Sequence, residues 1–148
     1  MRYLLDTNVL VNAIRESSLY TGIVTNYGLE NPGNLTIISE VTIGELYSLA
    51  LQRNWGNAKR ERMMRIIKRF TAQRISFESI YNTYADLDAY SQGRHPALPA
   101  PPGLTARNMG KNDLWLAATA YVSAAALLTT DGDFDHLDRF ITVIKITP

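Results

Sequence analysis

Five short apolar runs that alternate with longer helical stretches constrain the fold of this 148-residue chain most strongly. The apolar runs lie at residues 3–5, 35–38, 75–77, 125–129 and 142–146. Helices are predicted at residues 9–15, 19–28, 41–53, 57–71, 79–92 and 113–124. Alternation of this kind is typical of βαβ units, in which each helix returns the chain to a strand parallel to the last. The sequence therefore predicts an α/β fold, with a mostly parallel five-stranded sheet flanked by helices on both faces.

The boundaries of these elements agree with a single folding unit. Ser39 is predicted to cap the helix that begins near Glu40, and Asn112 to cap the helix that begins at Asp113. The chain contains no repeat and no linker long enough to divide it, so we expect residues 1–148 to form one domain.

The segment 93–110 is an irregular, proline-rich insertion within that domain. Four prolines fall between Gly93 and Gly103, a density that excludes a helix or a central strand. Because the segment leads towards Asp113, it could form a flap beside that residue. It could equally be a surface insertion without a function, and the sequence leaves both interpretations open.

Composition excludes several classes of protein. The chain has no cysteine, so it can form neither disulfides nor thiolate metal sites, and a reducing compartment is compatible with it. The apolar run after Met1 is too short for a signal-peptide core or a membrane span. We therefore expect a cytoplasmic protein with no membrane association.

Four acidic residues occupy distinctive places in this pattern. Asp6 ends the first apolar run and Asp131 follows the fourth, whereas Glu45 and Asp113 lie near the starts of predicted helices. In an open parallel sheet, strand ends and the helix starts that follow them meet at one edge, where ligands bind. Carboxylates gathered there repel one another unless cations neutralise them. Because their oxygens are hard ligands, the pattern predicts one or two Mg²⁺ or Mn²⁺ ions.

Each of these acids also has a purely structural interpretation. Asp6 could begin a turn, and Glu45 could complete a capping box with Thr42. Asp113 could be stabilised by the positive end of its helix dipole, and Asp131 could belong to an Asp-Gly turn. A purely structural explanation requires all four of these interpretations to hold at once, whereas the topology places all four side chains near one edge of the sheet. No Lys or Arg is placed in the sequence to neutralise Asp6 or Asp131, and an acid at a buried strand end is costly without a partner.

Basic residues are concentrated in one predicted helix. Between Arg53 and Arg74 there are eight Lys and Arg residues against one acid, whereas the rest of the chain has seven basic and thirteen acidic residues. Such a helix suits a polyanion such as nucleic acid, or an acidic partner protein. It could also be an ordinary solvated face, with the apolar residues between Met63 and Phe70 turned to the core. Both interpretations can hold together.

Four motifs carry a family resemblance, and they occur in the expected order between Arg2 and Leu137. They are Tyr-Leu-Leu-Asp6-Thr-Asn-Val-Leu, Ile-Ser-Glu-Val-Thr-Ile-Gly-Glu45-Leu, Lys-Asn-Asp113-Leu-Trp-Leu-Ala-Ala and Leu-Leu-Thr-Thr-Asp131-Gly-Asp133-Phe-Asp-His-Leu. This set resembles PIN-domain ribonucleases, most closely the VapC-type toxins of toxin–antitoxin pairs. The resemblance implies a PIN-like three-layer sandwich. It makes Asp6, Glu45, Asp113 and Asp131 the catalytic and metal-binding acids, with Thr7, Asn8, Thr130 and Asp133 as supporting residues.

The resemblance also implies an activity and partners. It predicts a Mg²⁺- or Mn²⁺-dependent endoribonuclease, the toxin of a toxin–antitoxin pair, whose products carry 5′-phosphate and 3′-hydroxyl ends. A small antitoxin protein would cover the acidic groove, and the toxin would form a homodimer. On the basic helix, Arg60, Arg62 and Arg65 would bind RNA phosphates. Arg15 and Lys111, which are closer to the acidic motifs in sequence, could also bind the RNA backbone.

Two other functions fit part of the pattern. One is a PIN-like module that only binds RNA or protein, although the presence of all four acids argues against it. The other is an aspartate-nucleophile phosphatase, which generally needs a second Asp two positions after the first, where this chain has Asn8. Trp115 is interpreted as a core residue instead of a base-stacking platform.

Overall fold

The computed structural model describes residues 1–148 and contains one five-stranded parallel sheet. Its strands are β1 (Arg2–Leu5), β2 (Leu35–Ser39), β3 (Thr71–Gln73), β4 (Ala126–Thr129) and β5 (Val143–Lys145). They lie in the order β3-β2-β1-β4-β5, and every neighbouring pair is parallel. The predicted α/β class and five-stranded sheet are confirmed.

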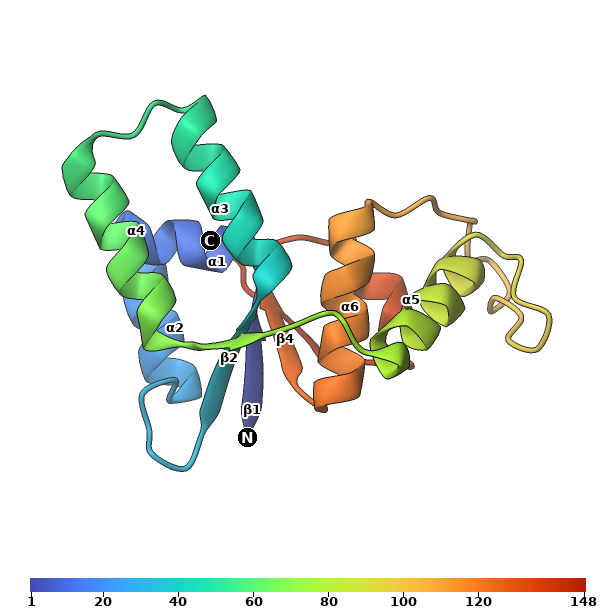
Figure 1. The fold of residues 1–148 in the computed structure, drawn as a ribbon. Coiled ribbons are helices and arrows are strands. Elements are labelled where there is room, and N and C mark those ends of the chain that lie inside the picture. Colours follow the sequence, from blue (N-terminus) through green and yellow to red (C-terminus); the bar gives the residue numbers. More distant parts are fainter.

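Helices cover both faces of the sheet (Figure 1). They are α1 (Thr7–Ile14), α2 (Ser18–Tyr27), α3 (Glu40–Gln52), α4 (Asn57–Arg69), α5 (Glu78–Ser91) and α6 (Lys111–Ser123), with a short 3₁₀ turn, η1 (Asp135–Leu137). Figure 1 shows α1 to α4 gathered on one side of the strands and α5 and α6 on the other. No helix is both long enough and apolar enough to cross a membrane.

The two layers of helices bury alternate residues of the same strands. Tyr3 and Leu5 belong to the core that includes residues of α1 to α4, whereas Leu4 belongs to the core that includes residues of α5 and α6. Ile38 and Ile37 of β2 divide between the same two cores. Successive side chains of a strand point to opposite faces, so a strand covered on both sides must be apolar throughout. This requirement explains the uninterrupted apolar runs of the sequence.

The third strand was predicted in the wrong place. Strand pairing with β2 involves Thr71–Gln73, not the apolar run at 75–77, and α4 ends at Arg69, two residues before the predicted end. β3 is an edge strand with mostly exposed side chains, so it has no hydrophobic periodicity from which it could be recognised. Phe77 instead precedes the first residue of α5.

Of the two predicted helix caps, one is confirmed and one is wrong. The Ser39 hydroxyl accepts a hydrogen bond of 3.1 Å from the Val41 N–H at the start of α3. Helix α6 begins earlier than predicted, at Lys111 with Gly110 as its cap, so Asn112 lies inside the helix. Glycine needs no side-chain bond to be acceptable at this position.

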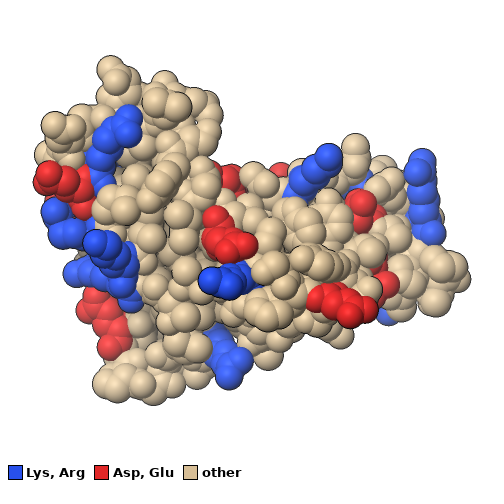
Figure 2. All heavy atoms as spheres, in the orientation of Figure 1, with Lys and Arg blue, Asp and Glu red and all other residues tan.

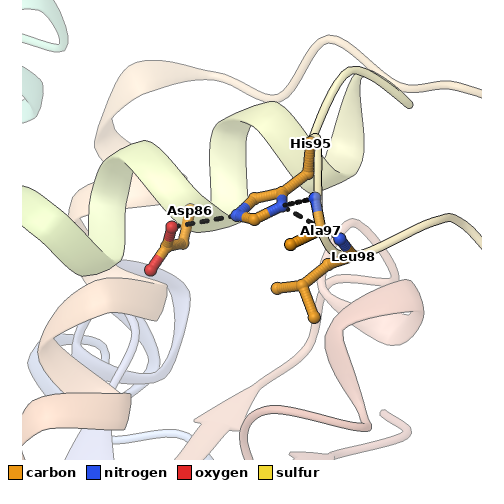
Figure 3. Close-up of polar contacts among 4 residues, drawn as sticks. All are labelled: Asp86, His95, Ala97 and Leu98. Carbon is orange, nitrogen blue, oxygen red and sulfur yellow. Dashed lines mark hydrogen bonds and ion pairs between the residues drawn. The ribbon is translucent and has the colours of Figure 1, made fainter.

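The segment 93–110 contains no helix or strand but is tied back to α5. His95 makes three hydrogen bonds there (Figure 3): Nδ1 accepts from the Ala97 and Leu98 N–H groups at 3.1 and 3.0 Å, and Nε2 lies 3.0 Å from Asp86 Oδ1. Because Nδ1 accepts twice, the ring proton lies on Nε2 and points to Asp86. The imidazole therefore links the start of the loop to helix α5.

We expect His95→Ala to loosen this loop locally. Each backbone amide that loses its acceptor forfeits about 1 kcal/mol, which corresponds to roughly 5-fold faster amide exchange. Hydrogen exchange in the native protein should therefore accelerate at Ala97 and Leu98 and stay constant in the sheet. Arg94→Ala, an exposed change in the same loop, serves as the control. Unchanged exchange at both amides would show that His95 does not hold the loop.

Candidate active site

All four predicted acids line one cavity of about 960 Å³ at the carboxyl ends of the strands. Asp6 and Asp131 come from the chain directly after β1 and β4, Glu45 from α3, and Asp113 from the first turn of α6. Helices α3 and α6, from opposite faces of the sheet, contact each other. The predicted convergence of four distant acids is confirmed. None of residues 93–110 lines this cavity, so the proline-rich loop is not a flap over it.

The order of the strands explains why the cavity lies there. The chain passes from β1 to β2 on one side and later returns to β4 on the other side of β1. The connections after β1 and β4 therefore diverge to opposite faces and leave a crevice between them, the usual ligand site of an open parallel sheet. Asp6 and Asp131 stand at this crevice because each is among the first residues after its strand.

Asp6 is held rigidly and is almost fully buried, with 6% of its surface exposed. As the cap of α1, it accepts a hydrogen bond of 2.6 Å at Oδ1 from the Thr7 N–H. Its Oδ2 accepts another of 2.6 Å from the Thr129 hydroxyl, which itself accepts the Asp131 N–H at 3.0 Å. Burial raises the pKa of Asp6, the two hydrogen bonds oppose that effect, and the charges of Glu45 and Asp131 add to it.

Thr7 connects Asp6 to the second acid. The Thr7 hydroxyl donates a 3.0 Å hydrogen bond to Glu45 Oε1. Glu45 therefore faces the cavity and not the start of its own helix, and the Thr42 hydroxyl, its alternative capping-box partner, is buried without any partner. The structural interpretation of Glu45 is wrong. For Asp6, both interpretations hold, since the residue caps α1 and lines the cavity.

The pKa of Asp113 is raised strongly above its ordinary value. Partial burial, followed by the charges of Asp6, Asp131, Asp133 and Glu45, raises its pKa to about 6. The carboxylates are thus close enough to oppose one another's ionisation. Asp131 lines the cavity and its Oδ1 accepts the Asp133 N–H at 3.0 Å. Asp133 is exposed and does not line the cavity, so Asp131 is the one of these two acids that belongs to the site.

The donor set suits a hard divalent cation, because every candidate ligand is a carboxylate oxygen and none is sulfur or imidazole. As the side chains stand, however, no three Asp, Glu or His residues are close enough together to hold an ion. Both oxygens of Asp6 are engaged with neighbouring donors, and Glu45 is engaged with Thr7. The acids share a cavity without forming a closed ligand shell.

The comparisons with known proteins identify the family. A family model of the PIN domain matches residues 3–140. The chain belongs to the PIN-domain family. A comparison with curated protein sequences gave no significant match.

Solved structures share the fold of this PIN domain over their full length. A chain of VapBC2 from Rickettsia felis, bound to a promoter DNA fragment, superposes with a TM-score of 0.76 at 21% identity, covering 99% of this chain and 100% of that one. VapBC-1 from nontypeable Haemophilus influenzae gives 0.73 at 22% identity, covering all of both chains. VapBC-5 from Mycobacterium tuberculosis, described as a member of a toxin–antitoxin family, gives 0.62 at 20%, covering 99% and 98%.

Cations line the same cavity of the PIN domain beside the acids. Arg15 and Arg53 belong to its lining, and Arg53 was not among the predicted site residues. Burial, followed by the charges of Arg15, Arg53 and Arg62, lowers the pKa of Lys59, which indicates that these cations are crowded together. Because Arg53 follows the last residue of α3, only the course of that helix brings it to the cavity.

The other predicted RNA-binding residues lie outside the cavity lining. Figure 2 shows Lys and Arg side chains gathered over the region that α4 occupies in Figure 1. Arg60 donates hydrogen bonds to the carbonyls of Trp55 and Ala50 at 2.8 and 3.2 Å, so it fastens α4 to the end of α3. Arg62 pairs with Glu16 at 3.3 Å. Arg65 and Lys111 are exposed.

Some of the predicted supporting residues line the cavity and one does not. Thr7, Asn8 and Thr130 line the cavity, whereas Asp133 does not. Thr129, which was not among the predicted site residues, is fully buried and donates a hydrogen bond of 2.6 Å to Asp6, as short as the one from the Thr7 N–H. The only signal for it was a hydroxyl residue at the end of an otherwise apolar strand. Position alone could not decide whether Thr129 or Thr130 turned towards Asp6.

Proposed function

We propose that this PIN domain is a Mg²⁺- or Mn²⁺-dependent endoribonuclease and the toxin of a toxin–antitoxin pair. The observation that carries the proposal is the shared cavity of four carboxylates from four separate elements, in which burial, and after it the charges of the neighbouring acids, raise the pKa of Asp113 to about 6. A bound cation relieves the electrostatic repulsion among carboxylates that oppose one another's ionisation, so such a cluster is stabilised strongly by a cation. The PIN-domain family membership and the fold shared with VapBC chains agree with it.

In this proposal, each acid has a defined task. Asp6 and Asp113 would hold the better-occupied ion, and Glu45 and Asp131 would complete the cluster. The chemistry that a divalent ion would supply there is activation of water at neutral pH and stabilisation of the charge on the phosphoryl and leaving oxygens. Thr129 and the Thr7 N–H fix the orientation of Asp6, so its carboxylate requires little reorganisation when a cation binds.

The direct test is cleavage of RNA by the purified native protein in EDTA, Mg²⁺ or Mn²⁺. We expect cleavage only with a divalent ion, and products with 5′-phosphate and 3′-hydroxyl ends. A Glu45→Gln protein purified in the same way controls for a contaminating nuclease. Cleavage that persists in EDTA, or that is equal in the Glu45→Gln preparation, would refute the proposal. Binding of RNA without cleavage would favour the non-catalytic PIN-like module.

Arg15 and Arg53 are proposed to bind the RNA backbone next to the acids. Each phosphate contact to single-stranded RNA contributes about 0.7 to the slope of log K against log salt concentration. Arg15→Gln with Arg53→Gln should therefore weaken RNA binding and reduce the slope by about 1.4. Arg65→Gln with Lys68→Gln removes the same charge from the exposed surface of α4. A larger effect of this second pair would place the RNA on α4 instead.

The proposed partners are an antitoxin and a second copy of this chain. VapBC-5 is described as a member of a family of toxin–antitoxin systems, which supports a small protein partner here. Expression of the native chain should arrest growth, and co-expression of its antitoxin should restore it. Light scattering of the purified protein tests the homodimer. Growth that is unaffected by an RNA-cleaving native chain would separate the enzymatic activity from the toxin role.

A further inference from the structure

One aromatic side chain lines the otherwise mostly polar cavity. Trp115 is the only aromatic residue of the lining, and Asn112, three residues earlier on the same face of α6, lines it too. Trp115 is partly exposed, so its interpretation as a core residue is incomplete: one part of the ring packs in the core shared with α5, and another faces the cavity. A partly exposed Trp beside four acids requires an explanation beyond packing.

Two tyrosines of α5 extend this aromatic surface. The Trp115 ring lies 4.2 Å from the Tyr84 ring, at an angle of 37°, and 6.2 Å from the Tyr81 ring, at 74°. Tyr81 is 49% exposed, as is Phe77 one turn before it. The tilted contact with Tyr84 and the edge-on contact with Tyr81 fix the indole plane, which reduces the entropy lost when a further ring stacks on it.

We propose that Trp115, which the Tyr81 ring contacts edge-on, forms a stacking platform for an unpaired nucleobase beside the cleaved phosphodiester bond. The inference rests on the proposed ribonuclease function and specifies its substrate: RNA whose base next to the cleaved bond is unstacked. An aromatic face binds any base, whereas a base inside a duplex keeps both faces covered. Continuity with the acidic cavity favours a nucleobase over the side chain of a protein partner, because the backbone of that nucleotide reaches the carboxylates.

Cleavage kinetics of Trp115→Leu test this platform. Leucine keeps an apolar contact with Tyr84 but removes the aromatic face. Loss of one stacked base costs about 10-fold or more in affinity, so KM should rise by about 10-fold while kcat changes little. Tyr121→Leu is the matched control, since Tyr121 is 53% exposed on the same helix and lies outside the cavity. Circular dichroism melting of each variant checks the fold, and Tyr81→Leu replaces Trp115→Leu if the latter fails to fold.

A second measurement isolates stacking from packing. The substrates are single-stranded oligoribonucleotides that each lack one base near the cleaved bond, together with the intact strand annealed to its complement. With the native protein, one abasic position should raise KM by about 10-fold, and the duplex should be a poor substrate. With Trp115→Leu, the KM should be the same whether or not that base is present, since the variant lacks the indole ring on which the base would stack.

The outcomes separate the two proposals. Equal KM values for the native protein and both aromatic variants, or equal cleavage of strand and duplex, would overturn the platform while leaving the ribonuclease intact. Unchanged RNA kinetics with weakened binding of the antitoxin would assign the aromatic surface to a protein partner, which also overturns it. Absence of any metal-dependent cleavage by the native protein would refute both proposals.

Discussion

Asp6→Asn is expected to reduce RNA cleavage by about 100-fold or more while leaving the fold intact. Asn has the same size as Asp, and its amide oxygen can still accept the Thr7 N–H at the start of α1. The variant removes the negative charge from the most buried of the four acids, and stabilisation by a bound cation is worth several kcal/mol. A loss of about 2.7 kcal/mol corresponds to this 100-fold decrease.

The measurement is kcat/KM on a fixed RNA substrate at saturating Mg²⁺, together with thermal melting of the variant. Asp138→Asn provides a matched control, because it makes the same chemical change at an exposed position outside the cavity. We expect the control to retain nearly full activity. Comparable activity of Asp6→Asn and Asp138→Asn would show that Asp6 only caps a helix.

Asp113→Asn is expected to stabilise the metal-free protein at neutral pH and to weaken its stabilisation by metal. The pKa of Asp113 is about 6 in the folded protein, above its ordinary value of 3.8. The folded state therefore binds this proton more tightly than the unfolded state does. Stability from this group is fully present below pH 3.8 and is lost as the pH rises through 6. At pH 7.5, without metal, the Asn variant should melt at a higher temperature than the native protein, and the difference should disappear near pH 4.

A divalent ion should reverse this order. If Mg²⁺ binds only the folded state, a concentration ten times the dissociation constant stabilises the native protein by about 1.4 kcal/mol, which corresponds to roughly 3–6 °C. Asp113→Asn should show a much smaller increase because it lacks one ligand. Affinity for Mg²⁺ should also fall below about pH 6, where the proton on Asp113 competes with the ion. A native melting temperature unchanged by millimolar Mg²⁺ and Mn²⁺ would falsify the metal site.

These predictions depend on contacts that the sequence indicates to different degrees. Asp6, Glu45, Asp113 and Asp131 could be selected in advance because strand ends and helix starts of a parallel sheet meet at one edge. The hydroxyl that holds Asp6 could not, since Thr129 and Thr130 are adjacent and only the end of β4 determines which one turns inward. Arg53 was missed for a related reason: it follows α3, and helix direction brings it to the cavity.

Charge alone was a poor guide to the surface that faces the acids. RNA binding by the basic residues of α4 stays a prediction, and in the structure Arg60 bonds to two backbone carbonyls and Arg62 pairs with Glu16. A guanidinium group can serve packing and capping as well as phosphate binding, and the sequence does not record which. The same holds for Trp115, whose helix position indicated burial but not the cavity beside it.

Local sequence patterns were sufficient to predict the α/β class, the apolar strands buried on both faces and the positions of the four acids at strand ends and helix starts. These follow from short-range patterns, because side-chain alternation and helix capping depend on neighbouring residues. Tertiary structure alone decided the polar edge strand β3, the bond from Thr129 to Asp6 and the course of the proline-rich loop away from the cavity. Each of these depends on a partner that is remote along the chain or on a choice between adjacent residues, and no local pattern specifies it.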